Sequence, residues 1–379
     1  MSKENCADVI IVGGGIIGAS TAYYLAKKGK SVILLEREMM GNGGSSRNGG
    51  GVRQSARDAR EMPLAMYGIN HIWPYLSEEL GVDTEYNQAG NIKLAKTQAH
   101  LDYYTNVIEA NRACGLDIDM LDQKQTREIC PCVADDVIGS CFCKTDGHAN
   151  PLTTTLGFYK RGRELGVCHI TGETVTKVLL HRGKAVGVKS ADGTIYSGDK
   201  IIITAGYESK HILNSVGIDI PMRHKLSECM VVEMQPKMPQ MMFTLPQEHT
   251  WGYGHQTKHG SFVFGGNGFA DHFLKQDGSE GNQPMTIPRV ARWLAEYVPM
   301  LADAKVIRSW SGWTDVTPDS CAVISKVDEI PGLITGCGFS GHGFGTAPAI
   351  GLTLSELACE EVCSVSVEGL RYDRLFMSK

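Results

Sequence analysis

The N-terminal region joins a short β-branched run directly to a glycine-rich loop. The run is Val9-Ile10-Ile11-Val12, and the loop is Gly13-Gly14-Gly15-Ile16-Ile17-Gly18. A continuous apolar run of this kind is typical of a strand buried on both faces of a parallel sheet. Gly13 permits a tight turn, Gly15 lets the backbone approach a pyrophosphate, and Gly18 lets the next helix pack against the strand. The pattern therefore predicts a Rossmann-type nucleotide-binding unit in an α/β fold.

The residues after this loop continue the same pattern. A helix is expected to run through Leu25 and to end at Gly29, and a second buried strand over 31–35 ends at Glu36. A carboxylate at that strand end can accept hydrogen bonds from a ribose diol, and it repels the 2′-phosphate of an NADP-type ligand. The phosphates of a dinucleotide are expected on the N-terminal amides of the intervening helix, where the helix dipole favours negative charge.

Charge and hydropathy exclude several classes of protein. The 379 residues are enough for two domains, and a formal net charge of -5 without a basic stripe excludes nucleic acid as an expected partner. No stretch reaches the roughly 20 apolar residues of a membrane span, and the run over 9–17 lacks the basic flank of an export signal. We therefore expect a cytoplasmic protein whose twelve cysteines are mostly free thiols.

Three further segments indicate a cofactor longer than one Rossmann half can hold. A glycine-rich stretch over 41–51 follows Glu36, a buried strand over 200–203 ends in Thr204-Ala205-Gly206, and a strand and glycine-rich turn over 333–345 lead into an apolar helix. The backbone of such glycine runs can pass close to a cofactor and line it with N–H groups. Since these segments are expected to return to one sheet, they favour FAD over NAD.

Taken together, these motifs resemble the D-amino acid oxidase superfamily of flavoproteins. The resemblance is to the branch with sarcosine oxidase, glycine oxidase and the FAD subunits of proline, hydroxyproline and opine dehydrogenases. It covers nearly the whole chain in the family's order. The residues that carry it are the N-terminal glycines with Glu36, Gly44-Ser45-Ser46, Thr204-Ala205-Gly206, Thr317-Pro318-Asp319 and Gly338-Phe339-Ser340-Gly341-His342-Gly343-Phe344.

The resemblance implies two domains. One is a discontinuous Rossmann-type FAD-binding domain with a parallel sheet, and the other is an α+β substrate domain on a mixed, largely antiparallel sheet. The FAD-binding domain is predicted to take residues 1–84, 145–215 and 305–379, and the substrate domain 85–144 and 216–304. The stretch from Met230 to Pro246, rich in methionine, is expected to cover the active site.

It also implies where a non-covalent FAD would lie. The isoalloxazine is expected between the loops over 44–53 and 338–345, with the amides of 343–346 near N1 and O2 of the ring. Val175 matches a position that contacts adenine through its backbone. The predicted cofactor-binding residues are Gly13, Gly15, Ile16, Ile17, Gly18, Glu36, Arg37, Gly44, Ser45, Ser46, Asn48, Gly49, Gly50, Val175, Ala205, Gly206, Gly312, Gly338, Gly341, His342, Gly343, Phe344 and Gly345.

The chain departs from monomeric sarcosine oxidase at three matched positions. Gly312 stands where that enzyme attaches its flavin to a cysteine, so that covalent bond cannot form. Val263 stands where it places a lysine that assists oxygen, which favours a dehydrogenase over an oxidase. Gly345 stands where a lysine pairs with the substrate carboxylate. His148 lies one position away from a histidine that carries a second flavin in heteromeric relatives, and no such bond is predicted.

A substrate carboxylate must therefore find another cation. Arg53, at the end of the glycine run, is the first candidate because a guanidinium can grip both oxygens, and Arg47 and His255 are the second. An exposed arginine at a helix start is the alternative interpretation of Arg53. Tyr253 is expected to face the substrate, and His342 to contact the flavin or to act structurally, since hydride transfer from a neutral amine needs no strong base.

Two Cys-x-Cys pairs raise the alternative of a metal site. Cys130 and Cys132 form one pair, and Cys141 and Cys143 the other. Thiolates could hold zinc or an iron–sulfur cluster, but the usual zinc spacing is Cys-x-x-Cys, and in a strand such a pair packs on one face. We therefore predict no metal.

The predicted function is FAD-dependent oxidation of a small amino acid or secondary amine to an imine. The partners implied are that amine, an electron acceptor or electron-transfer subunit, and further copies or other subunits in an oligomer. Two alternatives stay open. The chain could be a flavin-holding subunit with little activity alone, or a dehydrogenase of 2-hydroxy acids or glycerol phosphate, which needs a base beside the hydroxyl.

Overall fold

A mostly parallel eight-stranded sheet contains the N-terminal strand. The computed structural model describes residues 5–247, 250–267 and 285–376. The strand order is β17-β18-β11-β1-β2-β8, and the β9–β10 hairpin pairs with β11. The pairs among β18, β11, β1, β2 and β8 are parallel, as predicted for the strands around the first glycine loop. The strands are β1 (Cys6–Val12), β2 (Val32–Glu36), β8 (Cys168–Thr171), β9 (Val175–His181), β10 (Lys184–Ser190), β11 (Ile195–Ile203), β17 (Val323–Lys326) and β18 (Leu333–Cys337).

Other elements pack on both faces of this sheet. Successive residues of β1 point to opposite faces, so they belong to two different core clusters. Val9 and Ile11 pack under the helices α1 (Ile16–Lys27), α6 (Pro151–Glu164) and α9 (Gly343–Cys359). Ile10 and Val12 pack on the other side, against the β9–β10 hairpin and α7 (Glu208–Asn214). This explains why β1 is apolar at successive positions.

A second eight-stranded sheet has the order β16-β12-β15-β14-β13-β4-β6-β5. Only β13 and β4 pair in parallel, so the sheet is mixed and largely antiparallel, and the predicted fold class is confirmed. Its strands are β4 (Asn91–Ala95), β5 (Asp119–Asp122), β6 (Gly139–Cys143), β12 (Arg223–Met234), β13 (Met242–Gln247), β14 (Thr250–Gln256), β15 (Ser261–Asn267) and β16 (Val306–Val316).

The helix α8 (Thr286–Tyr297) packs on one face of the second sheet. Phe262 and Phe264 pack with Trp293 of α8. Gly252 and Gly254 of β14 lie on this face, where an added Cβ would meet aromatic rings, among them Phe264 and Trp293, at 2.5–3.0 Å. The alternate residues of β14, Tyr253 and His255, therefore point from the opposite face.

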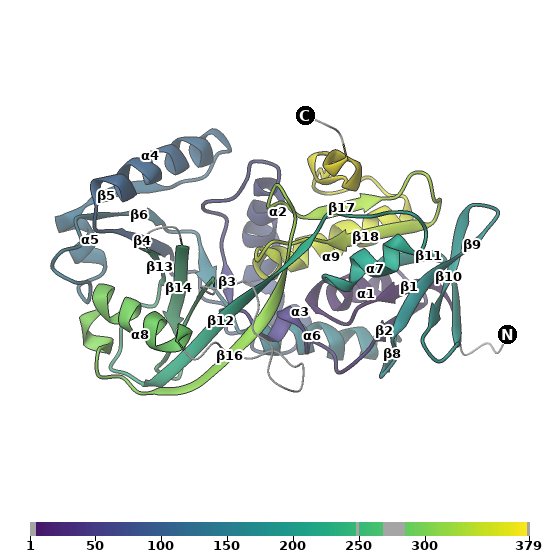
Figure 1. Cartoon of the computed structure of the whole chain (residues 1–379), viewed down its shortest axis with the longest axis horizontal. Helices are drawn as coiled ribbons and strands as arrows, with labels where there is room; N and C mark the ends of the chain where they lie inside the picture. The colour runs from purple at the N-terminus through teal and green to yellow at the C-terminus, as the bar shows by residue number, and fades with distance from the viewer. Residues whose placement is uncertain (1–4, 248–249, 268–284, 377–379) are drawn as a thin grey trace.

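The two sheets lie side by side, and the long strands β12 and β16, at one edge of the second sheet, extend from it toward the first (Figure 1). The small β3–β7 pair and α2 also lie in this central region (Figure 1). The remaining elements are β3 (Gly51–Val52), β7 (Gly147–His148), α2 (Met62–Tyr67), α3 (Leu76–Leu80), α4 (Gln98–Ala113) and α5 (Gln123–Ile129), with short helical turns at 44–46, 68–75, 299–301, 368–370 and 372–375.

The division into two domains stays a prediction. The first sheet takes its strands from 6–36, 168–203 and 323–337, and the second takes them from 91–143 and 223–316. β16 begins the range 305–379 that was predicted for the FAD-binding domain, yet it pairs along its length with β12 of the second sheet. In the part of the chain that the structure describes, no helix combines the length and hydropathy needed to cross a membrane.

Candidate active site

The first glycine loop is packed so tightly that side chains are excluded. Gly13 has a φ of 107°, and a Cβ there would lie 2.5 Å from the carbonyl oxygen of Thr204. A Cβ on Gly18 would clash with the carbonyl oxygen of Gly13. Helix α1 therefore begins directly against the end of β1, and its first amides face the loop.

Two predicted cofactor residues bond to amides of this loop. Glu36 accepts a hydrogen bond from the N–H of Gly14 at 2.7 Å, and the hydroxyl of Ser45 accepts one from Ile16 at 2.8 Å. The carbonyl of Glu36 also accepts from the N–H of Glu173 at 2.9 Å, which brings the start of β9 with Val175 to the same strand end. Four parts of the chain therefore lie close together: the first loop, the end of β2, the start of β9 and the second glycine-rich stretch, residues 41–51.

Arg37 lies outside this cluster. Its guanidinium is half exposed and contacts the carboxylate of Glu208 at 3.3 Å. Ala205 is inside the cluster, since a Cβ on Gly13 would lie 2.7 Å from its Cα. Gly206 follows it with a φ of 57°, at the turn into α7.

The second glycine-rich stretch contacts the face of the second sheet that carries Tyr253 and His255, which is called the inner face below. The N–H of Gly49 donates to the hydroxyl of Tyr253 at 3.1 Å, and a Cβ on Gly50 would lie 3.4 Å from Cε1 of His255. Asn48 holds the turn between them by accepting from the N–H of Gly50 at 2.9 Å. A Cβ on Gly51 would lie 3.0 Å from Cε of Met242, a residue of the stretch predicted to cover the site.

Arg47 is directed to β16. Its Nη1 donates to the carbonyl of Ser311 at 3.4 Å, and its own carbonyl accepts from the indole of Trp310 at 3.0 Å. A Cβ on Gly312 would lie 2.8 Å from Cβ of Arg47. The space beside Gly312 is therefore filled by an arginine side chain.

Arg53 is half buried just after β3. Its Nη1 donates to the carbonyl of Ser55 at 2.8 Å, which fixes the guanidinium over its own turn. Asp146 holds this turn by accepting from the N–H groups of Gln54 at 2.7 Å and Ser55 at 3.3 Å. Asp146 is fully buried, and Lys93, also buried, donates to the hydroxyl of Ser55.

The loop before α9 lies against the end of β16. Asp315 accepts from the N–H of Gly338 through its carboxylate at 2.7 Å and from the N–H of Ser340 through its carbonyl at 2.8 Å. Burial raises the pKa of Asp315 to about 6. Gly341 follows with a φ of 86° and turns the chain into α9.

The first turn of α9 packs on β3. A Cβ on Gly345 would lie 2.9 Å from the carbonyl oxygen of Gly51 and 3.0 Å from Cα of Val52. The carbonyl of Gly345 accepts from the indole of Trp73 at 2.7 Å, and Phe344 packs on the same ring. A lysine at this position would not fit without moving β3.

The family can now be assigned. The family described as DAO, FAD dependent oxidoreductase, matches residues 8–357. The chain belongs to the DAO family of FAD-dependent oxidoreductases. This confirms the predicted resemblance and shows that the protein is an oxidoreductase.

Several proteins are similar to this DAO-family chain. The beta subunit of sarcosine oxidase from Arthrobacter sp is 30% identical over 296 residues, which are 75% of this chain and 70% of that protein. L-proline dehydrogenase from P.horikoshii superposes with a TM-score of 0.89 at 25% identity and covers 98% of both chains. Glycine oxidase from Geobacillus kaustophilus shares the fold, with a TM-score of 0.87 at 22% identity over 98% of this chain and 99% of that one.

The residues of this DAO-family protein fit a bound FAD. The glycines let the loop, the end of β1 and the start of α1 approach one another without side chains between them, and the amides of Gly14 and Ile16 bond to polar side chains rather than to backbone. In the structure these amides bond to Glu36 and Ser45; a pyrophosphate would present equivalent acceptors to the amides, and ribose hydroxyls would donate to the carboxylate of Glu36. The glycines of the third segment that were predicted to contact the cofactor lie before or within the first turn of α9, and they are Gly338, Gly341, Gly343 and Gly345.

His342, the residue before α9, has two buried partners that the sequence did not reveal. Its ring Nδ1 lies 3.0 Å from a carboxylate oxygen of Glu61, and its carbonyl accepts from Nη2 of Arg57 at 3.3 Å. Burial is the main cause that lowers the pKa of His342. Burial also lowers the pKa of Arg57 to about 10. Sequence shows only an Arg–Glu pair spaced i,i+4, which is more typical of an exposed helix.

The other predicted histidine, His255, stacks on His148 with ring centroids 3.8 Å apart. The Nε2 of His148 lies 3.0 Å from the carbonyl oxygen of Gln240. Burial lowers the pKa of His148 to about 4, and that of His255 well below its usual value. Because both rings are neutral at physiological pH, His255 supplies no cation, and Arg53 is the stronger candidate for binding a carboxylate.

Val263 pairs directly with His255 in the sheet register. Cross-strand neighbours share a face, so Val263 lies on the face that carries Tyr253 and His255. The predicted alignment of this valine with the position that lines the flavin is therefore compatible with its place in the sheet.

The two cysteine pairs lie apart from each other, and of the four residues only Cys132 is partly exposed. Cys141 and Cys143 are both buried on β6, and the sulfurs of Cys130 and Cys132 lie 3.5 Å apart near the end of α5. Within residues 5–247, 250–267 and 285–376, no three histidine, cysteine or acidic side chains gather as metal ligands would.

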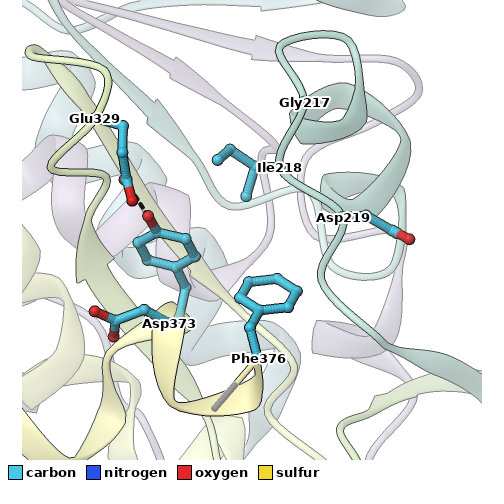
Figure 2. Close-up of a pocket in the computed structure, with 7 residues that line it drawn as sticks. Gly217, Ile218, Asp219, Glu329, Asp373 and Phe376 are labelled. Atoms are coloured by element: carbon cyan, nitrogen blue, oxygen red, sulfur yellow. Dashed lines mark hydrogen bonds between the residues drawn. The ribbon is translucent and has the colours of Figure 1, made fainter. Parts of the chain in front are cut away.

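A surface hollow of this DAO-family protein lies elsewhere (Figure 2). The side chain of Phe376 lies across from Ile218 (Figure 2). The hydroxyl of Tyr372 donates to Glu329. None of the predicted cofactor or substrate residues lines it. Its lining residues are Gly217, Ile218, Asp219, Glu329, Tyr372, Asp373 and Phe376.

Proposed function

We propose that this protein oxidises a small amino acid or secondary amine to an imine, with FAD bound non-covalently. The observation that carries the proposal is the position of Arg53, which ends the second glycine-rich stretch and meets the start of α9. A Cβ on Gly345 would lie 3.3 Å from the backbone nitrogen of Arg53, and the guanidinium is fixed by the carbonyl of Ser55. The similar proteins named as sarcosine oxidase and L-proline dehydrogenase support an amine with a carboxylate as the substrate class.

The residues that would hold the cofactor follow from the contacts of the first glycine loop. Glu36 would accept hydrogen bonds from the adenosine ribose, the amides around Gly14 and Ile16 would bind the pyrophosphate, and the backbone of Val175 would contact adenine. Gly312 carries no side chain that could bond to a flavin. When bound, FAD supplies a hydride acceptor at N5 of its ring.

The chain's own residues would position the amine. Arg53 would bind the carboxylate through two N–H groups, and Tyr253 and the neutral His255, which contact the glycine-rich stretch, would form one wall of the site. Burial under the second sheet disfavours an ammonium and so favours loss of its proton before oxidation. The amides at the start of α9 would stabilise negative charge on the pyrimidine end of the ring.

We further propose a dehydrogenase that passes its electrons to a carrier other than oxygen. Val263, on the inner face of the second sheet, offers no positive charge to a reduced oxygen species. Two similar proteins are themselves named as subunits, one of sarcosine oxidase and one of opine oxidase, and they support assembly with further chains. A heteromeric complex is therefore the second candidate state, in which this chain alone would show little turnover.

An anaerobic titration tests the reaction. Purified holoprotein is mixed with sarcosine, glycine, L- and D-proline, hydroxyprolines and opines, with 2-hydroxy acids as the competing class, and the visible flavin absorbance is followed. Bleaching by one amine class, with slow recovery in air and fast recovery with an artificial dye, is expected. Bleaching by hydroxy acids alone would overturn the proposal, and no bleaching by either class would favour a flavin-holding role within a complex.

A further inference from the structure

A buried guanidinium bridges the two chain segments that flank the candidate active site. Arg57 has a side chain that is 1% exposed. Its Nε donates to the carbonyl of Arg53 at 2.7 Å, and its Nη2 donates to the carbonyl of His342 at 3.3 Å. One planar group therefore connects the turn that contains Arg53, the candidate carboxylate-binding residue, to His342, the residue just before α9.

Glu61 completes this connection. Its carboxylate lies 3.5 Å from Nη1 of Arg57 and is 3% exposed. One oxygen accepts from the N–H of Ala322 at 2.8 Å, and the other lies 3.0 Å from Nδ1 of His342. The pair thus contacts three segments that are far apart in the chain: the 53–61 turn, the start of α9 and the residue before β17.

Stability alone does not explain such a pair. Removing two charges from water costs several kcal/mol, so apolar residues of the same size often do as well or better in a protein core. Unlike apolar residues, an ion pair makes directional hydrogen bonds. Each N–H and each oxygen holds one partner at a set distance and angle. The partners fixed here include the carbonyl groups of Arg53 and His342, in the two segments expected to flank the substrate and the flavin.

We propose that Arg57 and Glu61 are positioning residues that set the distance between Arg53 and the first turn of α9. They act through the backbone of Arg53 and His342, so a substrate carboxylate and the flavin ring are held in one geometry. The substrate half of this inference rests on the proposed function, and the flavin half rests on the family alone.

A lysine at position 57 tests the geometry separately from the charge. Arg57→Lys keeps a positive group beside Glu61, but a single ammonium cannot reach both carbonyls in the plane that the guanidinium spans. The loss of one charge-assisted hydrogen bond is about a tenfold effect. We expect the FAD dissociation constant of the apoprotein and the KM for the amine each to rise about tenfold.

The matched control is Arg60→Lys. Arg60 is three residues away and bonds to Asp58 and Asp319 rather than to Arg53 or His342. It should leave both constants within about twofold of the unaltered protein, since partly exposed pairs contribute little. Arg57→Lys values equal to those of Arg60→Lys would overturn the proposal.

A double variant separates positioning from folding. Arg57→Met with Glu61→Leu removes both charges, and the melting temperature of the FAD-free protein reports whether it folds. We expect a melting temperature close to that of the unaltered protein together with weakened FAD binding. A double variant that melts normally and binds FAD and amine normally would show that the pair only fills space, and would also overturn the proposal.

The two proposals fail in different ways. If no amine reduces the unaltered holoprotein, the proposed function fails, while the FAD dissociation constants of the variants still measure the flavin half. If amines do reduce it and the Arg57 variants match their control in both constants, the positioning proposal fails by itself.

Discussion

The hydroxyl of Tyr253 accepts a hydrogen bond from the backbone N–H of Gly49 at 3.1 Å. The contact joins the inner face of the second sheet to the glycine-rich stretch that follows β2. The backbone of Gly49 also packs against the edge of the tyrosine ring, because a Cβ on Gly49 would lie 2.7 Å from Cε2 of Tyr253. Burial raises the pKa of Tyr253 to about 12, so the phenol stays neutral at physiological pH. The tyrosine therefore fixes the path of the loop expected to line the flavin.

The first prediction is that Gly49→Ala weakens FAD binding by about tenfold. The added methyl must displace either the ring of Tyr253 or the loop, and overpacking of this kind costs about 1–3 kcal/mol. Titration of the apoprotein with FAD measures the effect. Gly43→Ala is the control in the same stretch, since a Cβ there meets nothing within 4 Å. Equal dissociation constants for the two variants would contradict the prediction.

The second prediction is that Arg53→Met lowers kcat/KM for an amino acid by about thirtyfold or more. A bidentate guanidinium–carboxylate contact is a charge-assisted interaction of about 2 kcal/mol or more. Steady-state assays with a carboxylate-bearing amine and with the same amine lacking the carboxylate check this. The value of kcat/KM should fall only for the amine that carries the carboxylate. A similar loss for both would mean that Arg53 shapes the site without binding the carboxylate.

The third prediction concerns the stability of the FAD-free protein below neutral pH. Burial raises the pKa of Asp315 from 3.8 to about 6, so the folded state holds the proton more tightly than the unfolded chain. The stability that this adds is fully present below pH 3.8 and is lost as the pH rises through about 6. Asp315→Asn should therefore be more stable than the unaltered protein at pH values above about 6, by about 1–3 kcal/mol.

Urea unfolding at several pH values measures this difference. Asparagine keeps an acceptor for the N–H of Gly338, which bonds to the carboxylate at 2.7 Å. The advantage of Asp315→Asn should shrink toward zero at about pH 4 and below, where aspartate is largely protonated in the folded state and increasingly so in the unfolded chain. A constant difference across the range would show that the carboxyl titrates at its ordinary pKa.

The first loop and its neighbours were predictable because their structure is local. A β-branched run, three spaced glycines and an acid at the next strand end each have one arrangement in a parallel sheet, and β1, α1 and β2 follow it. The mixed second sheet was predicted from the family resemblance rather than from periodicity. β16 shows the limit of this reasoning, because its partner β12 could not be identified from its own residues.

Long-range polar pairs could not be predicted in this way. Arg57 bonds to His342, which is 285 positions later in the chain, and nothing near either residue encodes that meeting. His148 and His255 likewise stack only because the fold brings β7 and β14 together. The spacing of glycines predicts the local path of the backbone. The partner of a buried charge, in contrast, depends on which distant segments the whole fold brings together.

The last prediction is that Val263→Lys speeds reoxidation of the reduced protein by oxygen. Val263 is half buried and pairs with His255 on the inner face of the second sheet, so a lysine there would point toward the expected flavin. A positive charge stabilises the negative charge that develops as oxygen accepts an electron, and such contacts are worth about 3 kcal/mol, or about a hundredfold in rate. Stopped-flow mixing of the amine-reduced protein with aerated buffer gives the rate. Val263→Met, which adds similar length without charge, should reoxidise as slowly as the unaltered protein. If both variants, or neither, gain oxygen reactivity, the proposal that the uncharged side chain at this position slows the reaction with oxygen is wrong.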